Sequence, residues 1–340
     1  MKHVNIPIFI PHLGCPNQCI FCNQRYISGT LQFDESEVER SINQVLRSVS
    51  EDCECEIAFF GGSFTGIDRE LMIRLLDTAQ KYVDSGRVIG IRMSTRPDYI
   101  NEEIVFILKK YSITFVELGI QTMNDFVLEK LKRGHKCSDT VNATKILVKN
   151  GIKFVGQMMI GLPYATPEDE IYCAEMICKL GASATRIYPT LVFKHTELEM
   201  LTVDGTYMPL SIENAVNRSA DVLDVFVKNN VECIRIGLCE SDNLHSVDTF
   251  YAGPNHPSIG EMVKSALYLK KIESQIEDKK ICLVDIICPV GAVSQIVGNK
   301  KKNTSYLKKK YGIKAISVKE KAELKPFEIK ILEKEDERCI

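Results

Sequence analysis

The chain has 340 residues, an apolar fraction of 45% and a formal net charge of -2, with a pI near 6.4. This length suits one large barrel or two domains, and the near-neutral charge excludes a global electrostatic field that recruits nucleic acid or membranes. No window approaches the roughly 20 apolar residues of a membrane span. The N-terminus shows no secretory cleavage signal, so we expect a cytoplasmic protein with no membrane partner.

Short apolar runs rich in β-branched residues alternate with helix-period segments along the first two thirds of the chain. The predicted strands are residues 5–12, 54–61, 88–94, 113–120, 151–161 and 184–190, and the predicted helices are 34–49, 68–83, 101–111, 124–134, 138–151 and 166–181. Parallel strands joined by helices close into a barrel or wind into an open sheet. In both cases the functional residues lie beyond the carboxyl ends of the strands.

The pattern weakens after a further predicted helix at residues 211–229. We therefore expect two domains: a core of residues 1–235, and a smaller C-terminal extension of residues 236–340 that covers or flanks the barrel mouth. The thirteen cysteines are scattered through predicted strands and helices of a long chain, which favours reduced thiols over a secreted disulfide framework.

Three cysteines, Cys15, Cys19 and Cys22, directly follow the first predicted strand in the stretch GCPNQCIFCNQ. A structural zinc site needs four ligands, and His12 is the nearby residue that could complete one. Cys19 and Cys22 could form a redox pair, which would not need Cys15. Three incidental or buried cysteines are the remaining alternative, although a loop of glycine, proline and amides is a poor place for core residues.

Three thiolates on a 4Fe-4S cluster leave one iron without a protein ligand. The spacing Cys15-x-x-x-Cys19-x-x-Cys22, with Phe21 before the last cysteine, resembles the signature of the radical S-adenosylmethionine (SAM) superfamily. This resemblance implies a 4Fe-4S cluster on the three cysteines, SAM chelated by the fourth iron and reductive cleavage to a 5′-deoxyadenosyl radical. It also implies an electron donor such as a flavodoxin or a ferredoxin.

Five ordered segments, IRMSTRPDYI, VELGIQTMND, RGH, IGLPYATPED and RIYPTLVFKHTELE, resemble the radical-SAM domain of the Elongator catalytic subunit and its short bacterial relatives. The resemblance implies an α/β fold, a partial (β/α)6 barrel of the radical SAM type, here without the acetyltransferase domain. GGSFTG lies where the superfamily carries a Gly-Gly-Glu segment, with serine in the third place. The implied SAM contacts are Gly61, Gly62, Ser63, Ser94, Thr95, Arg96, Gln121, Ile160, Leu162 and Arg186.

The segment GNKKKNTSYLKKKYG combines clustered cations with aromatic residues, a combination that suits an RNA backbone and a stacked base. A solvated helix face is the alternative interpretation of such a charge run. The candidate RNA-binding residues are Lys300, Lys301, Lys302, Lys308, Lys309 and Lys310. Weaker candidates for a catalytic role are Lys194, His195 and His256, and Lys132, Arg133 and His135 could line the barrel mouth.

The leading hypothesis is a radical SAM enzyme that modifies tRNA. A radical SAM enzyme acting on a small metabolite or peptide would share every SAM-site residue and differ in the extension. A non-enzymatic RNA-binding or metal-storage protein would not need five loops ordered around one end of a barrel.

Overall fold

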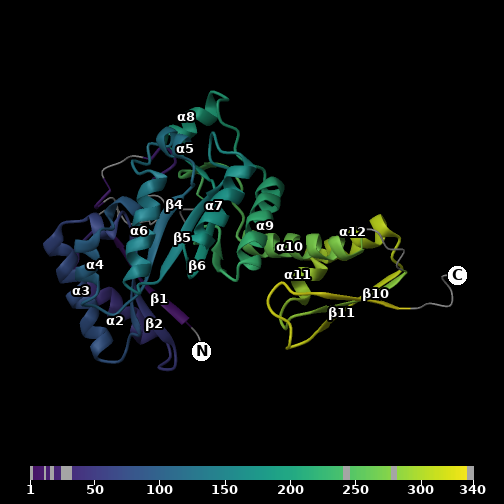
Figure 1. Cartoon of the computed structure of the whole chain (residues 1–340), viewed down its shortest axis with the longest axis horizontal. Helices are drawn as coiled ribbons and strands as arrows, with labels where there is room; N and C mark the ends of the chain where they lie inside the picture. Colours follow the sequence, from purple (N-terminus) through teal and green to yellow (C-terminus); the bar gives the residue numbers. More distant parts are fainter. Residues whose placement is uncertain are drawn as a thin grey trace.

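The computed structural model describes residues 3–10, 13–15, 19–23, 33–239, 246–276 and 282–334. Seven parallel strands form the main sheet, and their order along the sheet follows their order along the chain (Figure 1). These strands are β1 (His3–Ile10), β2 (Glu54–Gly61), β3 (Gly90–Thr95), β4 (Ile113–Gln121), β5 (Phe154–Ile160), β6 (Ala184–Pro189) and β8 (Glu232–Ile236). The strands are parallel and joined by helices, so the predicted α/β fold is confirmed.

Helices connect successive strands and cover the outer face of the sheet. They are α2 (Val38–Ser48), α3 (Arg69–Asp84), α4 (Glu102–Leu108), α5 (Asp125–Lys130), α6 (Cys137–Lys149), α7 (Pro167–Lys179), α8 (Glu197–Val203) and α9 (Ile212–Lys228). Side chains suited to N-capping start several of them. Asn101 accepts the Ile104 N–H, Thr166 accepts the Asp169 N–H, and Asp68 accepts the Leu71 N–H.

Each of the six predicted strands overlaps an observed one, and the predicted helices match α2 to α7 and α9. The seventh strand, β8, was not predicted. Its register against β6 shifts between Thr185 and Arg186, so one residue of β8 is bulged and the simple alternation of a strand is broken.

The two faces of the sheet differ in chemistry. Alternate residues such as Val116, Leu118 and Ile120 of β4 belong to one large apolar cluster shared with the helices. The residue between Val116 and Leu118 is Glu117, which is fully buried on the opposite, concave face. Apolar packing against helices therefore fixes the strands, while their other face is free to carry polar side chains.

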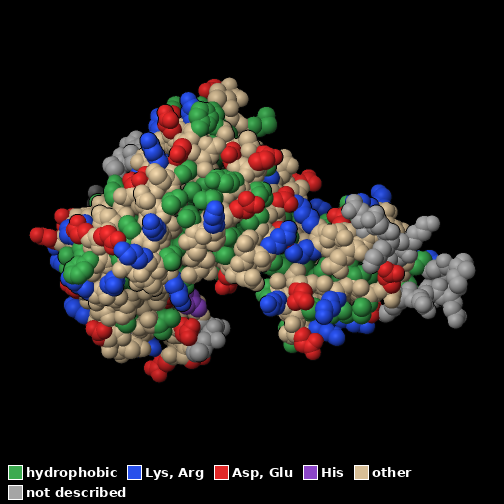
Figure 2. All heavy atoms as spheres, in the orientation of Figure 1, with side chains coloured by type: hydrophobic (Ala, Val, Ile, Leu, Met, Phe, Trp, Pro, Cys, Tyr) green, Lys and Arg blue, Asp and Glu red, His purple; other side chains and the backbone are tan. Residues whose placement is uncertain are grey.

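The chain from the middle of α10 (Ile259–Ile276) onward forms a smaller lobe. A three-stranded sheet places β10 (Leu283–Cys288) between β11 (Ala315–Glu320), which is parallel to it, and β12 (Lys330–Lys334), which is antiparallel. Its helices are α10 (Ile259–Ile276), α11 (Val293–Val297) and α12 (Lys302–Tyr311). Figures 1 and 2 show this lobe beside α9, at the edge of the main sheet, and not over the carboxyl ends of the strands.

One continuous helix joins the two parts of the molecule. The first half of α10 contributes Val263 and Leu267 to the main apolar cluster, whereas Tyr268 and Ile272 belong to the separate cluster of the small lobe. The packing thus changes from one core to the other within a single helix. Among the described residues, no helix is long and apolar enough to cross a membrane.

Candidate active site

The cysteine loop lies at the carboxyl end of β1. Cys19 is buried, with 5% of its surface exposed, while Cys15 and Cys22 are half-buried. The Cys22 N–H donates to the Cys19 carbonyl at 2.9 Å. The Ile20 N–H donates to the Leu131 carbonyl, so the loop is tied to the segment that follows α5.

The Gly-Gly-Ser segment after β2 packs directly against the cysteine loop. The Ser63 N–H donates to the Leu13 carbonyl at 3.1 Å, and the Gly62 N–H donates to the Ile10 carbonyl at 3.0 Å. A Cβ on Gly62 would lie 2.0 Å from the Leu13 carbonyl oxygen, so only glycine permits this approach. The structure therefore brings together two segments that are about fifty residues apart in the sequence.

The loop after β3 is joined to the same site. Thr65 Oγ1 lies 2.7 Å from Thr95 Oγ1 and donates to the Tyr99 carbonyl at 2.9 Å. Arg96 is 1% exposed and forms a bidentate ion pair with Asp98, at 2.9 and 2.7 Å. Burial by itself lowers the pKa of Arg96, but Asp98 and the neighbouring Cys15 outweigh it and raise the pKa.

Arg133, from the predicted RGH segment, reaches the second cysteine. Its Nη1 lies 3.7 Å from Cys19 Sγ, and its Nη2 donates to the Gly119 carbonyl at 2.9 Å. The side chain is buried, and no carboxylate pairs with it within the described part of the chain. A buried cation without an anionic partner costs free energy, so this position suits an anionic group.

His135 lies buried beside this guanidinium, with 4% of its surface exposed. Burial, together with the positive charge of Arg133, lowers the pKa of His135 to about 3. The imidazole is therefore neutral at physiological pH.

A network of charged side chains crosses the concave face below the loops. Arg92 lies 2.9 Å from Glu56 and 3.3 Å from Glu117. Glu117 also accepts hydrogen bonds from Arg186 at 2.8 Å and from Gln157 at 2.7 Å. The nearby Tyr188 and Glu117, acting against burial, raise the pKa of Arg186, so its charge is fixed.

The loop after β5 completes the ring of loops. Leu162 packs in one cluster with Ile20 of the cysteine loop, whereas Ile160 packs in the main core between sheet and helices. Gly161 donates its N–H to Glu170 at 2.6 Å and accepts the Tyr207 hydroxyl at 2.6 Å. These bonds tie the loop to α7 and to the segment after α8.

The weaker catalytic candidates lie at the rim. The backbone N–H of Lys194 donates to Thr249, which joins the ribbon of β7 (Val192–Phe193) and β9 (Phe250–Ala252). His195 is exposed, and its backbone N–H donates to Glu199 at the start of α8. His256 is half-buried in the loop before α10.

The lysines predicted to bind RNA are all exposed and lie in the small lobe, away from the strand ends. Lys308 and Lys309 belong to α12, as the solvated-helix alternative also predicts. Lys310 differs from them, because its ammonium group lies 2.7 Å from Glu273 and close to the rings of Tyr306 and Tyr311.

The polar groups at the strand ends fit a cluster and SAM. Several buried polar atoms there have no hydrogen-bond partner among the residues that the structure describes: Ser63 Oγ, Gln121 Oε1, Arg133 Nε, Arg186 Nε and both ring nitrogens of His135. Since buried polar groups in proteins are normally paired, such atoms suit a polar ligand on the concave face. The residues therefore fit the two groups that the resemblance implies.

The described side chains contain no group of three or more His, Cys, Asp or Glu close enough to hold a single metal ion. His12, the fourth ligand of the zinc alternative, lies outside the described residues. The roles of the three cysteines and of the SAM contacts stay predictions.

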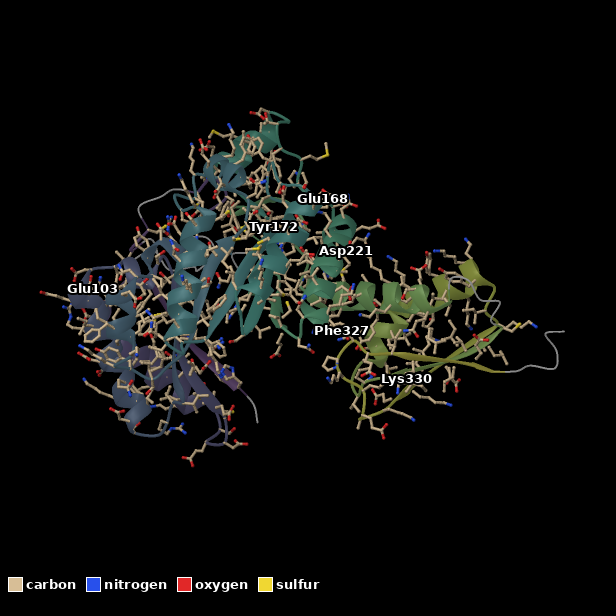
Figure 3. All side chains as sticks on the ribbon, viewed as in Figure 1. Glu103, Glu168, Tyr172, Asp221, Phe327 and Lys330 are labelled. Atoms are coloured by element: carbon tan, nitrogen blue, oxygen red, sulfur yellow. The ribbon has the colours of Figure 1, made fainter. Side chains whose placement is uncertain are left out.

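A pocket of about 650 Å³ lies on the outer surface between α7 and α9. Its walls include Glu168, Tyr172 and Asp221, which Figure 3 shows along this face of the molecule. Its lining residues come from α7 and α9, so it is separate from the loops at the strand ends.

Sequence reasoning missed Glu56, Arg92, Glu117 and Gln157 as part of the site. The signal was present, since each is a charged or amide residue within an otherwise apolar strand. What the sequence could not supply is the register that aligns them across four strands.

Comparison with known families gives two matches. The model described as the radical SAM superfamily matches residues 9–176, and the model of the Radical_SAM C-terminal domain matches residues 182–269. The second match starts at β6 and ends within α10, so it spans the boundary predicted at residue 235.

Similar proteins include an uncharacterised protein of Methanocaldococcus jannaschii, 31% identical over 66% of this chain and 72% of that protein. The tRNA uridine(34) acetyltransferase of the same organism is 34% identical over 42% of this chain, but the match spans only 27% of that enzyme. Among solved structures, the archaeal Methanocaldococcus infernus Elp3 has a TM-score of 0.61 and 22% identity, covering 81% of this chain and 63% of that one.

Proposed function

Because the chain belongs to the radical SAM superfamily, we propose that Cys15, Cys19 and Cys22 hold a 4Fe-4S cluster and that the concave face binds SAM beside it. When bound, these groups would supply radical chemistry, through reductive cleavage of SAM, for removal of a hydrogen atom from the substrate. Cys15, Cys19 and Cys22 would supply the three thiolate ligands of the cluster, and SAM would bind next to it. The electron comes from a donor such as a flavodoxin or a ferredoxin.

The observation that carries this proposal is the set of unpartnered polar atoms beside the cysteine loop. Ser63 Oγ, after β2, and Gln121 Oε1, at the end of β4, are buried and have no hydrogen-bond partner within the described part of the chain. They offer hydrogen bonds to a polar ligand. Gln121 also has a φ of 67°, which directs the chain away from the strand at this point.

The charged network below the loops orients the SAM contacts. Glu117 holds the Nη2 of Arg186 at 2.8 Å, while the Nε of Arg186 has no hydrogen-bond partner in the described ranges of the chain. A guanidinium fixed in this way can bind a carboxylate or a ribose hydroxyl without losing side-chain freedom. Arg133 contributes a positive charge next to Cys19, which offsets the negative charge of a thiolate-bound cluster.

We propose tRNA as the substrate on two grounds. A tRNA uridine(34) acetyltransferase is 34% identical over 42% of this chain, and exposed lysines cluster in the small lobe. Acetyl transfer is not part of the proposal, since the match spans only 27% of that relative.

The experiment is an anaerobic assay of the full chain with its reconstituted cluster, SAM and dithionite, in which 5′-deoxyadenosine is quantified with and without bulk tRNA. The proposal predicts the nucleoside in both cases, and faster formation with tRNA than with an unrelated RNA of equal length. No nucleoside from a protein with a verified cluster would contradict the chemistry. Equal rates with and without tRNA would contradict the substrate and direct attention to small metabolites or peptides.

A further inference from the structure

A small pocket lies where β6 and β8 end, beside the site of the proposed reaction. We propose that this pocket binds a phosphate group of the substrate RNA, with Arg235 and His256 as its ligands. The inference rests on the proposed function for the identity of the RNA. The pocket itself follows from the geometry of three segments: the end of β8, the loop after β6 and the loop before α10.

The bulge in β8 places Arg235 on the concave face. Thr185 of β6 pairs with Cys233, but the next residue, Arg186, pairs with Arg235, so Ile234 has no counterpart. Arg186 faces the concave side, where it binds Glu117. Because paired residues share a face of the sheet, Arg235 lies on that side too.

Arg235 differs from the other charged residues of the concave strands. Arg92 and Arg186 both pair with Glu117, whereas no carboxylate pairs with Arg235 among residues that the structure describes. Its side chain is half-buried. A half-buried guanidinium with free donors, next to a second arginine, favours an anion as its partner.

The pocket measures about 90 Å³ and has Arg235 and His256 in its walls, together with Pro189, Gly237 and Asn255. No Asp or Glu is among the described residues that line it. Its volume is roughly that of three water molecules, which suits one small anionic group and not a whole nucleotide.

His256 presents a fixed donor to this pocket. Its Nδ1 accepts the Ser258 N–H at 3.0 Å, so the proton of the neutral ring is on Nε2. The 18-residue helix α10 begins at Ile259, which also lines the pocket. The partial positive charge of this helix N-terminus adds to that of Arg235.

The loop that carries His256 is held rigidly against the strand ends. Gly253 has a φ of 113°, and a Cβ there would lie 3.0 Å from the Thr190 carbonyl oxygen. Pro254 and Pro257 restrict the backbone on either side of His256. A rigid loop loses little conformational entropy on binding, which a recognition site for a small group requires.

The pocket lies next to a predicted SAM contact, so a phosphate bound in it would position the substrate close to SAM. Arg186 is a predicted SAM contact on β6, and Arg235 is its direct neighbour on β8. A phosphate held at Arg235 would therefore fix one point of an RNA chain next to the reacting end of the half-barrel. Arg235 acts as a substrate-positioning residue in this account.

The test is calorimetric titration of the full-length, cluster-loaded protein with inorganic phosphate. We expect a millimolar dissociation constant for the wild type and an increase of roughly tenfold or more in Arg235→Gln, because a charge-assisted hydrogen bond is removed. His256→Gln should weaken binding less. Arg47→Gln, an exposed arginine on α2, is the matched control and should bind phosphate like the wild type.

Thermal unfolding of each variant shows whether the fold is intact, and Arg235→Lys, which keeps the charge, should recover part of the affinity. Unchanged phosphate binding in a folded Arg235→Gln protein would overturn the inference, and so would acetate binding more tightly than phosphate. Phosphate binding that depends on Arg235, together with no tRNA effect on 5′-deoxyadenosine formation, would keep the pocket and remove tRNA as the substrate.

Discussion

The concave face of the main sheet and the surface of the small lobe both carry charged residues, but these are buried and paired on the concave face and exposed on the small lobe. On the concave face, Glu117 is fully buried and shared by Arg92 and Arg186. On the small lobe, Lys308 and Lys309 extend into solvent. Buried charges cost free energy unless they are paired, whereas exposed ones cost little. A substitution among the charged residues therefore has a larger energetic cost on the concave face than on the small lobe.

The difference also separates their proposed roles. A rigid, paired network with a few unpartnered atoms can orient a ligand and its reacting bonds. Exposed lysines on a helix attract a polyanion without fixing its position. We therefore expect changes on the concave face to abolish function or stability, and changes on the small lobe to alter binding by degrees.

The largest effect is expected at the cysteine loop. Cys19→Ser should prevent assembly of the cluster and abolish 5′-deoxyadenosine formation, because a hydroxyl is a poor iron ligand compared with a thiolate. Iron content and visible absorbance after reconstitution measure the first effect. Cys53→Ser is the control, since Cys53 lies next to Ser50 at the start of β2 and far from the loop. Equal iron content in the two variants would contradict the assignment.

The second effect concerns the stability of the network. Glu117→Gln leaves two buried guanidinium groups without their shared anion and should lower the free energy of unfolding by about 3–5 kcal/mol. Urea unfolding followed by circular dichroism measures it. The exposed Glu103, which pairs with Arg69 at 3.4 Å, provides the comparison, and Glu103→Gln should cost less than about 1 kcal/mol. A similar loss of unfolding free energy in the two variants would contradict the claim that the buried network is the more costly one to disrupt.

The third effect is electrostatic. Arg133→Gln removes a positive charge beside Cys19 and should lower the reduction potential of the cluster by roughly 100 mV, the order expected for one charge a few ångströms away at an effective dielectric constant near 20. Arg133→Lys keeps the charge and should change the potential less. A potentiometric titration monitored by electron paramagnetic resonance gives both values. An unchanged potential in Arg133→Gln would show that the guanidinium does not face the cluster.

The smallest effect is expected on the small lobe. Replacing Lys308 and Lys309 with Gln should weaken tRNA binding and reduce the salt dependence of the association constant, by about one logarithmic unit for each RNA phosphate that a lysine no longer neutralises. Fluorescence anisotropy at several salt concentrations measures this slope. Lys145→Gln, on α6 of the core, is the control. The same slope in the wild type and in the double lysine variant would show that tRNA does not bind at Lys308 and Lys309.

The sequence predicted the strands of the core well because each is a continuous apolar run between turn residues. It also placed Ser63, Arg96 and Gln121 after strands β2, β3 and at the end of β4, where the structure finds them at one end of the sheet. Motif and strand position together were sufficient to place these three residues, and their contact with SAM stays a prediction.

The remaining features depend on three-dimensional register. The charged network needs Glu56, Arg92 and Glu117 to align across neighbouring strands, and no local pattern encodes that alignment. The bulge at Ile234 obscured β8 and the orientation of Arg235. The helix α10 was not predicted either, since its two halves pack into different cores and no single apolar stripe describes it.

The most direct test of the central claim is electron paramagnetic resonance of the reduced, reconstituted protein before and after addition of SAM. If the three cysteines hold a cluster with one iron open to SAM, the spectrum of the reduced cluster changes when SAM is added, and the change is absent in Cys19→Ser. A cluster spectrum that SAM leaves unaltered would contradict the account, because the concave face would then not bring SAM to the iron.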